Sequence, residues 1–215
     1  FDVKNKNKNT NNLKKIYYDQ DNHLKAESVD IFIKKNTLYE DLHLNFEFEN
    51  DILNLHNIFV PLKKAINLSF NLDGYDQTKL DKLFIGKILN DGKVVYCQTS
   101  LKKNKLLAST RDFGKFKIVI DKEKPKIEMK NLNKVNGVIG GRYLKFKIFD
   151  NESGIKNYRG TINGKWILME YDPKTNILTH DLNDGIVSKQ ENNLEVLVTD
   201  KVGNISKFET IFYNK

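Results

Sequence analysis

Three acidic residues in two turn motifs are the side chains of this sequence best suited to chemistry. Asp150 and Glu152 belong to the motif 150–155 (DNESGI), and Asp200 belongs to the motif 198–204 (VTDKVGN). Carboxylate oxygens are the ligands that calcium prefers, and the loops of a Greek-key sandwich can meet at one end. The pattern therefore indicates a candidate calcium site made of Asp150, Glu152 and Asp200.

A structural role explains the same two motifs more simply. Aspartate side chains commonly accept hydrogen bonds from the backbone amides of their own turn. Gly154 and Gly203 follow at positions where such a turn requires a positive φ, which glycine adopts without strain. Calcium binding and turn formation are therefore alternatives for these motifs.

Trp166, the only tryptophan, is the candidate binding residue. It lies in a predicted strand at 165–171, directly after the pair Asn163-Gly164, which is a strong hairpin signal. We expect its ring to fill the middle of a core, where it would bury on the order of 200 Å². Stacking against a ligand is its alternative role.

The histidines form no catalytic zinc motif. Zinc peptidase sites combine several histidines, two of them closely spaced, and this sequence has no His-x-His. It also lacks a phosphate-binding glycine loop and a Gly-x-Ser-x-Gly elbow. We therefore expect no enzymatic activity from this chain. We interpret its four histidines as surface or structural residues: His23, His43, His56 and His180.

Alternation of apolar and polar residues predicts the strands that position these side chains. In the segment 42–48, leucines and phenylalanines fall on one face and polar residues on the other. An Asp91-Gly92 hairpin joins the predicted strands 83–89 and 94–99. Only residues 76–82 are a helix candidate. The sequence thus predicts an all-β protein.

A charged segment that ends in a proline, residues 121–125, divides the chain. We predict a flexible leader at 1–12, a β-sandwich domain at 13–120, a linker at 121–125 and a second β-sandwich domain at 126–215. Strands recur about every 10 residues in the second domain, which is typical of an immunoglobulin- or fibronectin-like sandwich. These strands are 143–149, 157–162, 165–171, 177–181, 194–199 and 207–212.

Composition supports two folded domains. The chain has 215 residues, 39% of them hydrophobic and 11% aromatic. The net charge of +8 comes from lysines that alternate with apolar residues, as in 115–118 and 145–148, which is typical of a solvated strand face. Binding of an anionic polymer is the alternative role of these lysines, but we expect no nucleic-acid partner. We also expect no transmembrane segment.

The single cysteine and the first residue of the sequence are two further informative features. Cys97, the only cysteine, lies in a strand-like run and is expected to be a small core or half-buried residue without a reactive role. The sequence begins with Phe1 and has no apolar leader after it, so we expect it to be part of a longer polypeptide.

Several segments, in order, resemble one known family. They are similar to the C-terminal region of Bacteroidetes-type exported proteins of the lysostaphin/LytM-like zinc metallopeptidase family. The segments of the second domain are 121–127 (DKEKPKI), 150–156 (DNESGIK), 162–174 (INGKWILMEYDPK), 178–182 (LTHDL) and 198–209 (VTDKVGNISKFE). Weaker similarity in the first domain covers 32–41 (FIKKNTLYED) and 110–116 (TRDFGKF).

The resemblance implies an exported protein of the bacterial periplasm or cell envelope. Family members hold zinc with histidines and an aspartate, none of which can be placed on this chain. Any zinc would belong to an upstream peptidase domain, and we expect no cofactor in this chain. The expected function is a non-catalytic accessory or binding region that positions the upstream domain or contacts peptidoglycan or envelope proteins. The alternative is an independent protein–protein interaction module of the periplasm or outer membrane.

Overall fold

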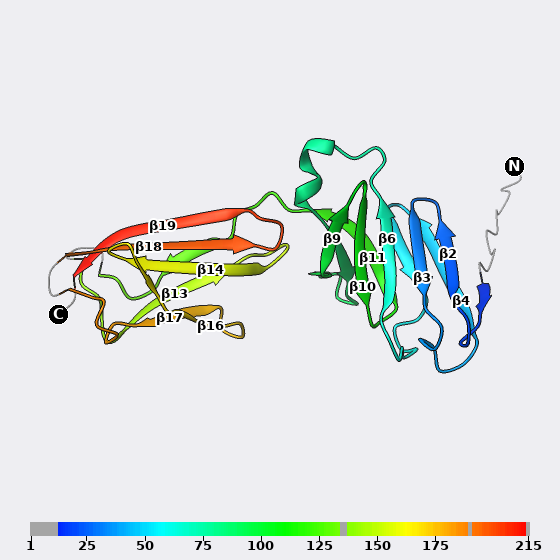
Figure 1. The fold of residues 1–215 in the computed structure, drawn as a ribbon, viewed down its shortest axis with the longest axis horizontal. Coiled ribbons are helices and arrows are strands. Elements are labelled where there is room, and N and C mark those ends of the chain that lie inside the picture. The colour runs from blue at the N-terminus through cyan, green and yellow to red at the C-terminus, as the bar shows by residue number, and fades with distance from the viewer. Residues whose placement is uncertain (1–12, 134–136, 189–190, 214–215) are drawn as a thin grey trace, which may run out of the picture. The chain divides into compact units, whose positions relative to one another are not determined.

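The computed structural model describes residues 13–133, 137–188 and 191–213 (Figure 1). The chain forms two compact units, residues 1–120 and 121–215. The predicted leader at 1–12 lies outside the described residues. Apart from one short 3₁₀ helix, η1 (Gln77–Lys82), the regular elements of the described residues are strands. The all-β prediction is confirmed, and no helix in these residues is long and apolar enough to cross a membrane.

The first unit is built from two antiparallel sheets. The larger sheet has six strands in the order β1 (Leu13–Ile16), β4 (Leu42–Glu49), β5 (Ile52–Leu55), β11 (Gly114–Ile120), β7 (Leu83–Ile88) and β8 (Val94–Tyr96). The other has five strands in the order β2 (Asn22–Ala26), β3 (Val29–Ile33), β6 (Ile66–Asn71), β10 (Lys105–Thr110) and β9 (Thr99–Lys102).

A single hydrophobic core joins these two sheets. In β6, alternate residues face this core as the period-two pattern predicts, so that Ile66, Leu68 and Phe70 are buried. Phe116 on β11 is fully buried and pairs in register with Leu53 of β5. The predicted hairpin also forms, with Gly92 at a φ of 81°.

The second unit contains two four-stranded antiparallel sheets. One has the order β12 (Lys126–Met129), β13 (Tyr143–Phe149), β17 (Ile177–Asp181) and β16 (Glu170–Asp172). The other has the order β15 (Lys165–Ile167), β14 (Ile155–Ile162), β18 (Glu191–Asp200) and β19 (Ile205–Tyr213). Strands β12, β13, β16 and β17 form one sheet, and β14, β15, β18 and β19 form the other. This is how an immunoglobulin-like sandwich divides its strands between two sheets.

The predicted single strand at 165–171 is wrong, because the chain changes sheets within it. β15 pairs with β14, whereas β16 pairs with β17 in the opposite sheet. Leu168 and Met169 make the crossing, and Met169 is buried in the core. Apolar residues follow one another at 166–169 because the segment passes from one sheet to the other.

The expectation that Trp166 fills the core is also wrong. Its side chain is 56% exposed on the outer face of its sheet, and Ile167 occupies the core instead. The core of this unit includes the fully buried Phe146, and the half-buried Phe208 packs against it with the two ring centroids 5.7 Å apart. Strand alternation decides the outcome, because adjacent residues of one strand cannot both point inward.

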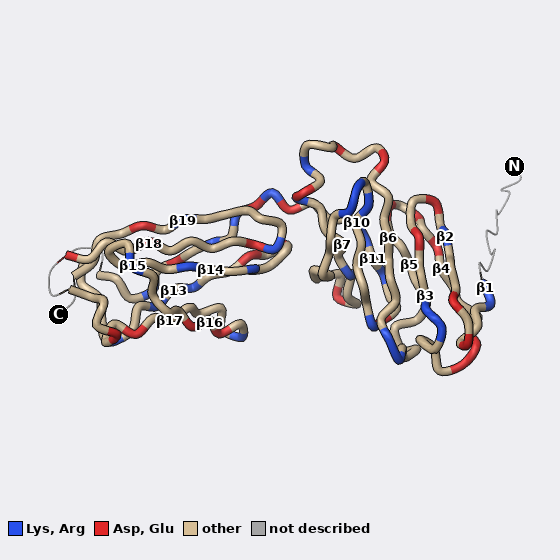
Figure 2. Tube along the Cα trace, viewed as in Figure 1, with Lys and Arg blue, Asp and Glu red and all other residues tan. Residues whose placement is uncertain are grey.

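The charged residues are interspersed over both units (Figure 2). In β13, Phe146 and Ile148 are buried. The lysines that precede each of them differ, since Lys145 is exposed and Lys147 is half-buried. This arrangement is the solvated strand face that the alternating lysines predict.

Candidate functional site

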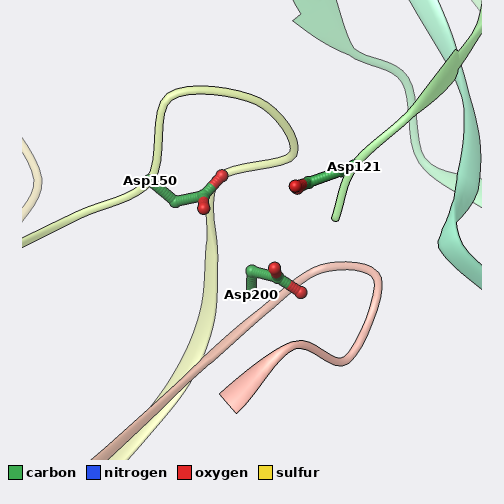
Figure 3. Close-up of side chains that lie close together, drawn as sticks. All are labelled: Asp121, Asp150 and Asp200. Atoms are coloured by element: carbon green, nitrogen blue, oxygen red, sulfur yellow. The ribbon is translucent and has the colours of Figure 1, made fainter. Parts of the chain in front are cut away.

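Three aspartates converge at one end of the second sandwich (Figure 3). Asp121 comes from the segment before β12, Asp150 from the turn between β13 and β14, and Asp200 from the end of β18. One carboxylate oxygen from each lies within 4.8 Å of the others. Asp121 and Asp200 are fully buried, and Asp150 is half-buried. We call these three residues the aspartate cluster.

Each of the two motif aspartates organises its own turn. Asp150 Oδ1 accepts hydrogen bonds from the amides of Glu152 (3.1 Å) and Gly154 (2.7 Å). Both Gly154 and Gly203 adopt a φ of 84°, so the positive φ expected from the turn chemistry is present.

Asp200 makes the equivalent contacts in the second turn. Its Oδ1 accepts hydrogen bonds from the amides of Val202 (3.0 Å) and Asn204 (2.8 Å). Its Oδ2 accepts a hydrogen bond from Asn204 Nδ2 at 2.7 Å. The turn-forming role of both motif aspartates is therefore visible in the hydrogen bonds.

Asp121 is the member of the cluster that sequence reasoning missed. Its Oδ2 accepts a hydrogen bond from the amide of Ser153 at 3.1 Å, and its Oδ1 accepts one from the amide of Glu123 at 3.0 Å. Asn204 Nδ2 also donates to the Asp121 carbonyl at 3.2 Å. The first residue of the predicted linker thus belongs to the second unit. The only sequence signal for Asp121 is that it begins segment 121–127, which resembles the peptidase family.

Glu152, the third predicted calcium ligand, is exposed and is not one of the three converging carboxylates. The structure places Asp121 where the prediction had Glu152. Calcium binding by Asp150 and Asp200 stays a prediction.

Burial raises the pKa of Asp150 above its ordinary value of 3.8, and the charges of Asp121 and Asp200 raise it further. The folded state therefore holds the proton of the Asp150 carboxyl group more tightly than the unfolded chain does. The stabilising contribution of Asp150 is present below pH 3.8 and is lost as the pH rises through the raised pKa.

We expect Asp150→Asn to melt at the same or a higher temperature than the wild type at pH 7 in EDTA. The amide oxygen can still accept the two turn hydrogen bonds, while the buried charge is gone. The advantage should shrink as the pH falls toward 4. Thermal melts of both proteins from pH 4 to pH 7 measure this, and a lower melting temperature of the variant in EDTA would contradict it.

The same melts test the calcium prediction. If the aspartate cluster binds calcium, millimolar calcium raises the melting temperature of the wild type but not that of Asp150→Asn, since a ligand that binds only the folded state stabilises it. No shift of the wild type at millimolar calcium refutes calcium binding.

Trp166 marks a second feature, the outer face of the β15-β14-β18-β19 sheet. In register across this sheet, Trp166 lies opposite Thr161, Thr161 opposite Glu195, and Glu195 opposite Glu209. Beside this row is a groove of about 430 Å³ lined by Thr161, Glu195 and Glu209, with Asn193 and Ile211. We call this surface the Trp166 face.

Lys207 forms ion pairs with both acidic side chains of the Trp166 face, Glu195 and Glu209. Its Nζ lies 2.8 Å from Glu195 Oε2 and 2.7 Å from Glu209 Oε1. These two hydrogen bonds raise the pKa of Lys207, which is charged at any physiological pH. The face therefore combines an exposed indole with a paired charge network and polar side chains.

The four histidines lie apart, and none belongs to the aspartate cluster. His43 is exposed on β4, and His23 is exposed on β2, where its ring packs against that of Phe32. His56 Nδ1 accepts a hydrogen bond from the Asn45 amide at 3.3 Å, and burial lowers the pKa of His56.

His180 is buried between the sheets of the second unit. Its Nδ1 lies 2.8 Å from the carbonyl oxygen of Leu168, at the point where the chain crosses from one sheet to the other. Its Nε2 lies 3.5 Å from Asp184 Oδ2. These contacts fit the structural role predicted for it.

Cys97 is a free, half-buried cysteine that packs against the core of the first unit. Burial raises the pKa of its thiol, which disfavours the reactive thiolate.

The fold and these sites define a protein of two tandem β-sandwiches. A model of the Zu5-like domain family matches residues 13–121, about half of the chain and close to the limits of the first unit. The chain belongs to the Zu5-like domain family. No curated protein matches the sequence.

Proposed function

We propose that this chain is a non-catalytic binding region of an exported cell-envelope protein of the lysostaphin/LytM-like metallopeptidase family. In this proposal it contacts peptidoglycan or envelope proteins and thereby positions an upstream domain. The observation that favours binding is the 56% exposure of Trp166 on a sheet face. An indole ring combines a large apolar face with an N–H donor, which suits it to contact a partner.

The hydrogen bonds support a structural role for the aspartate cluster. Its carboxylates accept backbone hydrogen bonds within the turns that they organise, so they serve the framework. The resemblance of segments 121–127, 150–156 and 198–209 to the peptidase family's C-terminal region supports the envelope context. These segments include all three cluster aspartates.

One observation favours the alternative of a protein–protein interaction module. Among the described residues, β19 is an edge strand of nine residues that pairs with β18 on one side. On its other side, within the described residues, Tyr213 exchanges backbone hydrogen bonds with Gly137 and Ile139, and Ser206 Oγ donates to the Pro125 carbonyl. An open strand edge is a template for adding a strand from a partner.

Co-sedimentation with purified, insoluble peptidoglycan tests the proposed function. The wild-type chain should sediment with it, and Trp166→Ala should reduce the bound fraction several-fold, because truncating an exposed aromatic anchor typically costs 1 kcal/mol or more. Phe59→Ala is the matched control, since Phe59 is an aromatic residue 82% exposed in the other unit.

Equal sedimentation of the wild type and Trp166→Ala would show that the Trp166 face does not bind peptidoglycan. If the wild type itself stays in solution, peptidoglycan is not the partner. Chemical crosslinking in cell-envelope extracts would then be needed to identify a protein partner at β19.

A further inference from the structure

The first unit has a groove that the proposed function does not use. It lies over the outer face of the β2-β3-β6-β10-β9 sheet and has a volume of about 1080 Å³. This is slightly above the range of about 300–1,000 Å³ that is typical of ligand sites. We call it the β6 groove, because β6 is the central strand of this sheet.

One row of residues across the β6 groove joins an aromatic pair to polar side chains. In register, His23 lies opposite Phe32, Phe32 opposite Asn67, and Asn67 opposite Ser109. The His23 and Phe32 rings are 4.6 Å apart between centroids and inclined at 35°. Together they form an apolar platform at one side of the sheet.

The rest of the lining consists mainly of groups that both donate and accept hydrogen bonds. Ser109 Oγ donates to Asn67 Oδ1 at 2.7 Å, which leaves the Asn67 amide nitrogen available as a donor. Ser69, Ser100 and Gln98 line the same groove. Amides and hydroxyls of this kind suit a ligand that is rich in hydroxyl groups.

The charges of the β6 groove largely cancel. Asp30, its one carboxylate, lies opposite Lys25 in the register and forms an ion pair with Lys105 at 2.9 Å. The lining therefore has no concentration of cations that would favour a polyanion. It favours a neutral ligand instead.

We propose that the β6 groove binds an extended, neutral oligosaccharide. A pyranose ring offers an apolar C–H face to the His23–Phe32 platform and equatorial hydroxyls to the row that includes Asn67 and Ser109. The five strands, about 4.8 Å apart, give the sheet a width of roughly 19 Å, enough for several sugar units. The site belongs to the first unit and does not depend on the Trp166 face.

Calorimetric titration of the full chain with chitohexaose tests this proposal. Binding should be saturable, and Phe32→Ala should weaken it about 2- to 10-fold, the loss that corresponds to one aromatic contact. Phe32→Tyr keeps the ring and should retain the affinity. Phe59→Ala removes an exposed aromatic ring outside the groove in the same unit and should bind as the wild type does. Circular dichroism melts establish that each variant is folded.

Three results would overturn the proposal. They are the absence of chitohexaose binding at millimolar concentration, unchanged affinity of a folded Phe32→Ala variant, and tighter binding of a sulfated hexasaccharide than of chitohexaose.

Discussion

Replacing Phe116 by alanine is expected to lower the free energy of unfolding of the first unit by about 3–5 kcal/mol. Phe116 is fully buried on β11, between β5 and β7, in the middle of the six-stranded sheet. Removing its ring leaves a cavity that strands held in register on both sides cannot collapse to fill. Denaturant unfolding followed by far-UV circular dichroism measures the loss.

Phe59→Ala is the control for this prediction, because it removes the same side chain from an exposed position in the same unit. It should change the free energy of unfolding by no more than about 0.5 kcal/mol. Trp166 is the only tryptophan and lies in the second unit, so the unfolding transition seen by its fluorescence should be nearly the same in both variants. Similar stability of Phe116→Ala and Phe59→Ala would contradict the described core.

Asp200→Ala is expected to cost about 2–4 kcal/mol in the second unit. The buried carboxylate accepts hydrogen bonds from the amides of Val202 and Asn204 and from Asn204 Nδ2. Alanine would remove the acceptor of the Val202 and Asn204 amides in a part-buried turn, and losing such an acceptor is costly. Asn204 Nδ2 keeps the carbonyl oxygens of Asp121 and Glu123 as acceptors. Unfolding followed by Trp166 fluorescence measures the effect.

Asp200→Asn separates the hydrogen bonds of Asp200 from its charge. The asparagine amide oxygen can accept the two backbone hydrogen bonds, and the variant no longer places a negative charge beside Asp121 and Asp150. In EDTA it should recover most of the stability lost in Asp200→Ala. If Asp200→Asn is as unstable as Asp200→Ala, the charge matters more than the turn hydrogen bonds.

Much of the fold follows from local patterns in the sequence. The strands β13 and β17 match the predicted segments 143–149 and 177–181, because period-two alternation reflects which face of a strand is buried. The turns of Asp150 and Asp200 were also predictable, since each aspartate bonds to amides two and four residues away.

The remaining features depend on contacts between distant residues. The break between β15 and β16 is set by which strand each half pairs with, and no local signal specifies this. The exposure of Trp166 follows from that pairing. Asp121 joins the aspartate cluster through Ser153, 32 residues further along the chain, and that contact cannot be inferred from spacing.

The most direct test of the proposed binding role is a fluorescence titration of the chain with soluble peptidoglycan fragments. Trp166 is the only tryptophan, so its emission reports on the proposed contact surface itself. We predict a saturable change of its intensity or emission maximum as the indole becomes covered. Emission that stays constant while the fragments bind, as measured by calorimetry, would contradict a role for the Trp166 face in that binding.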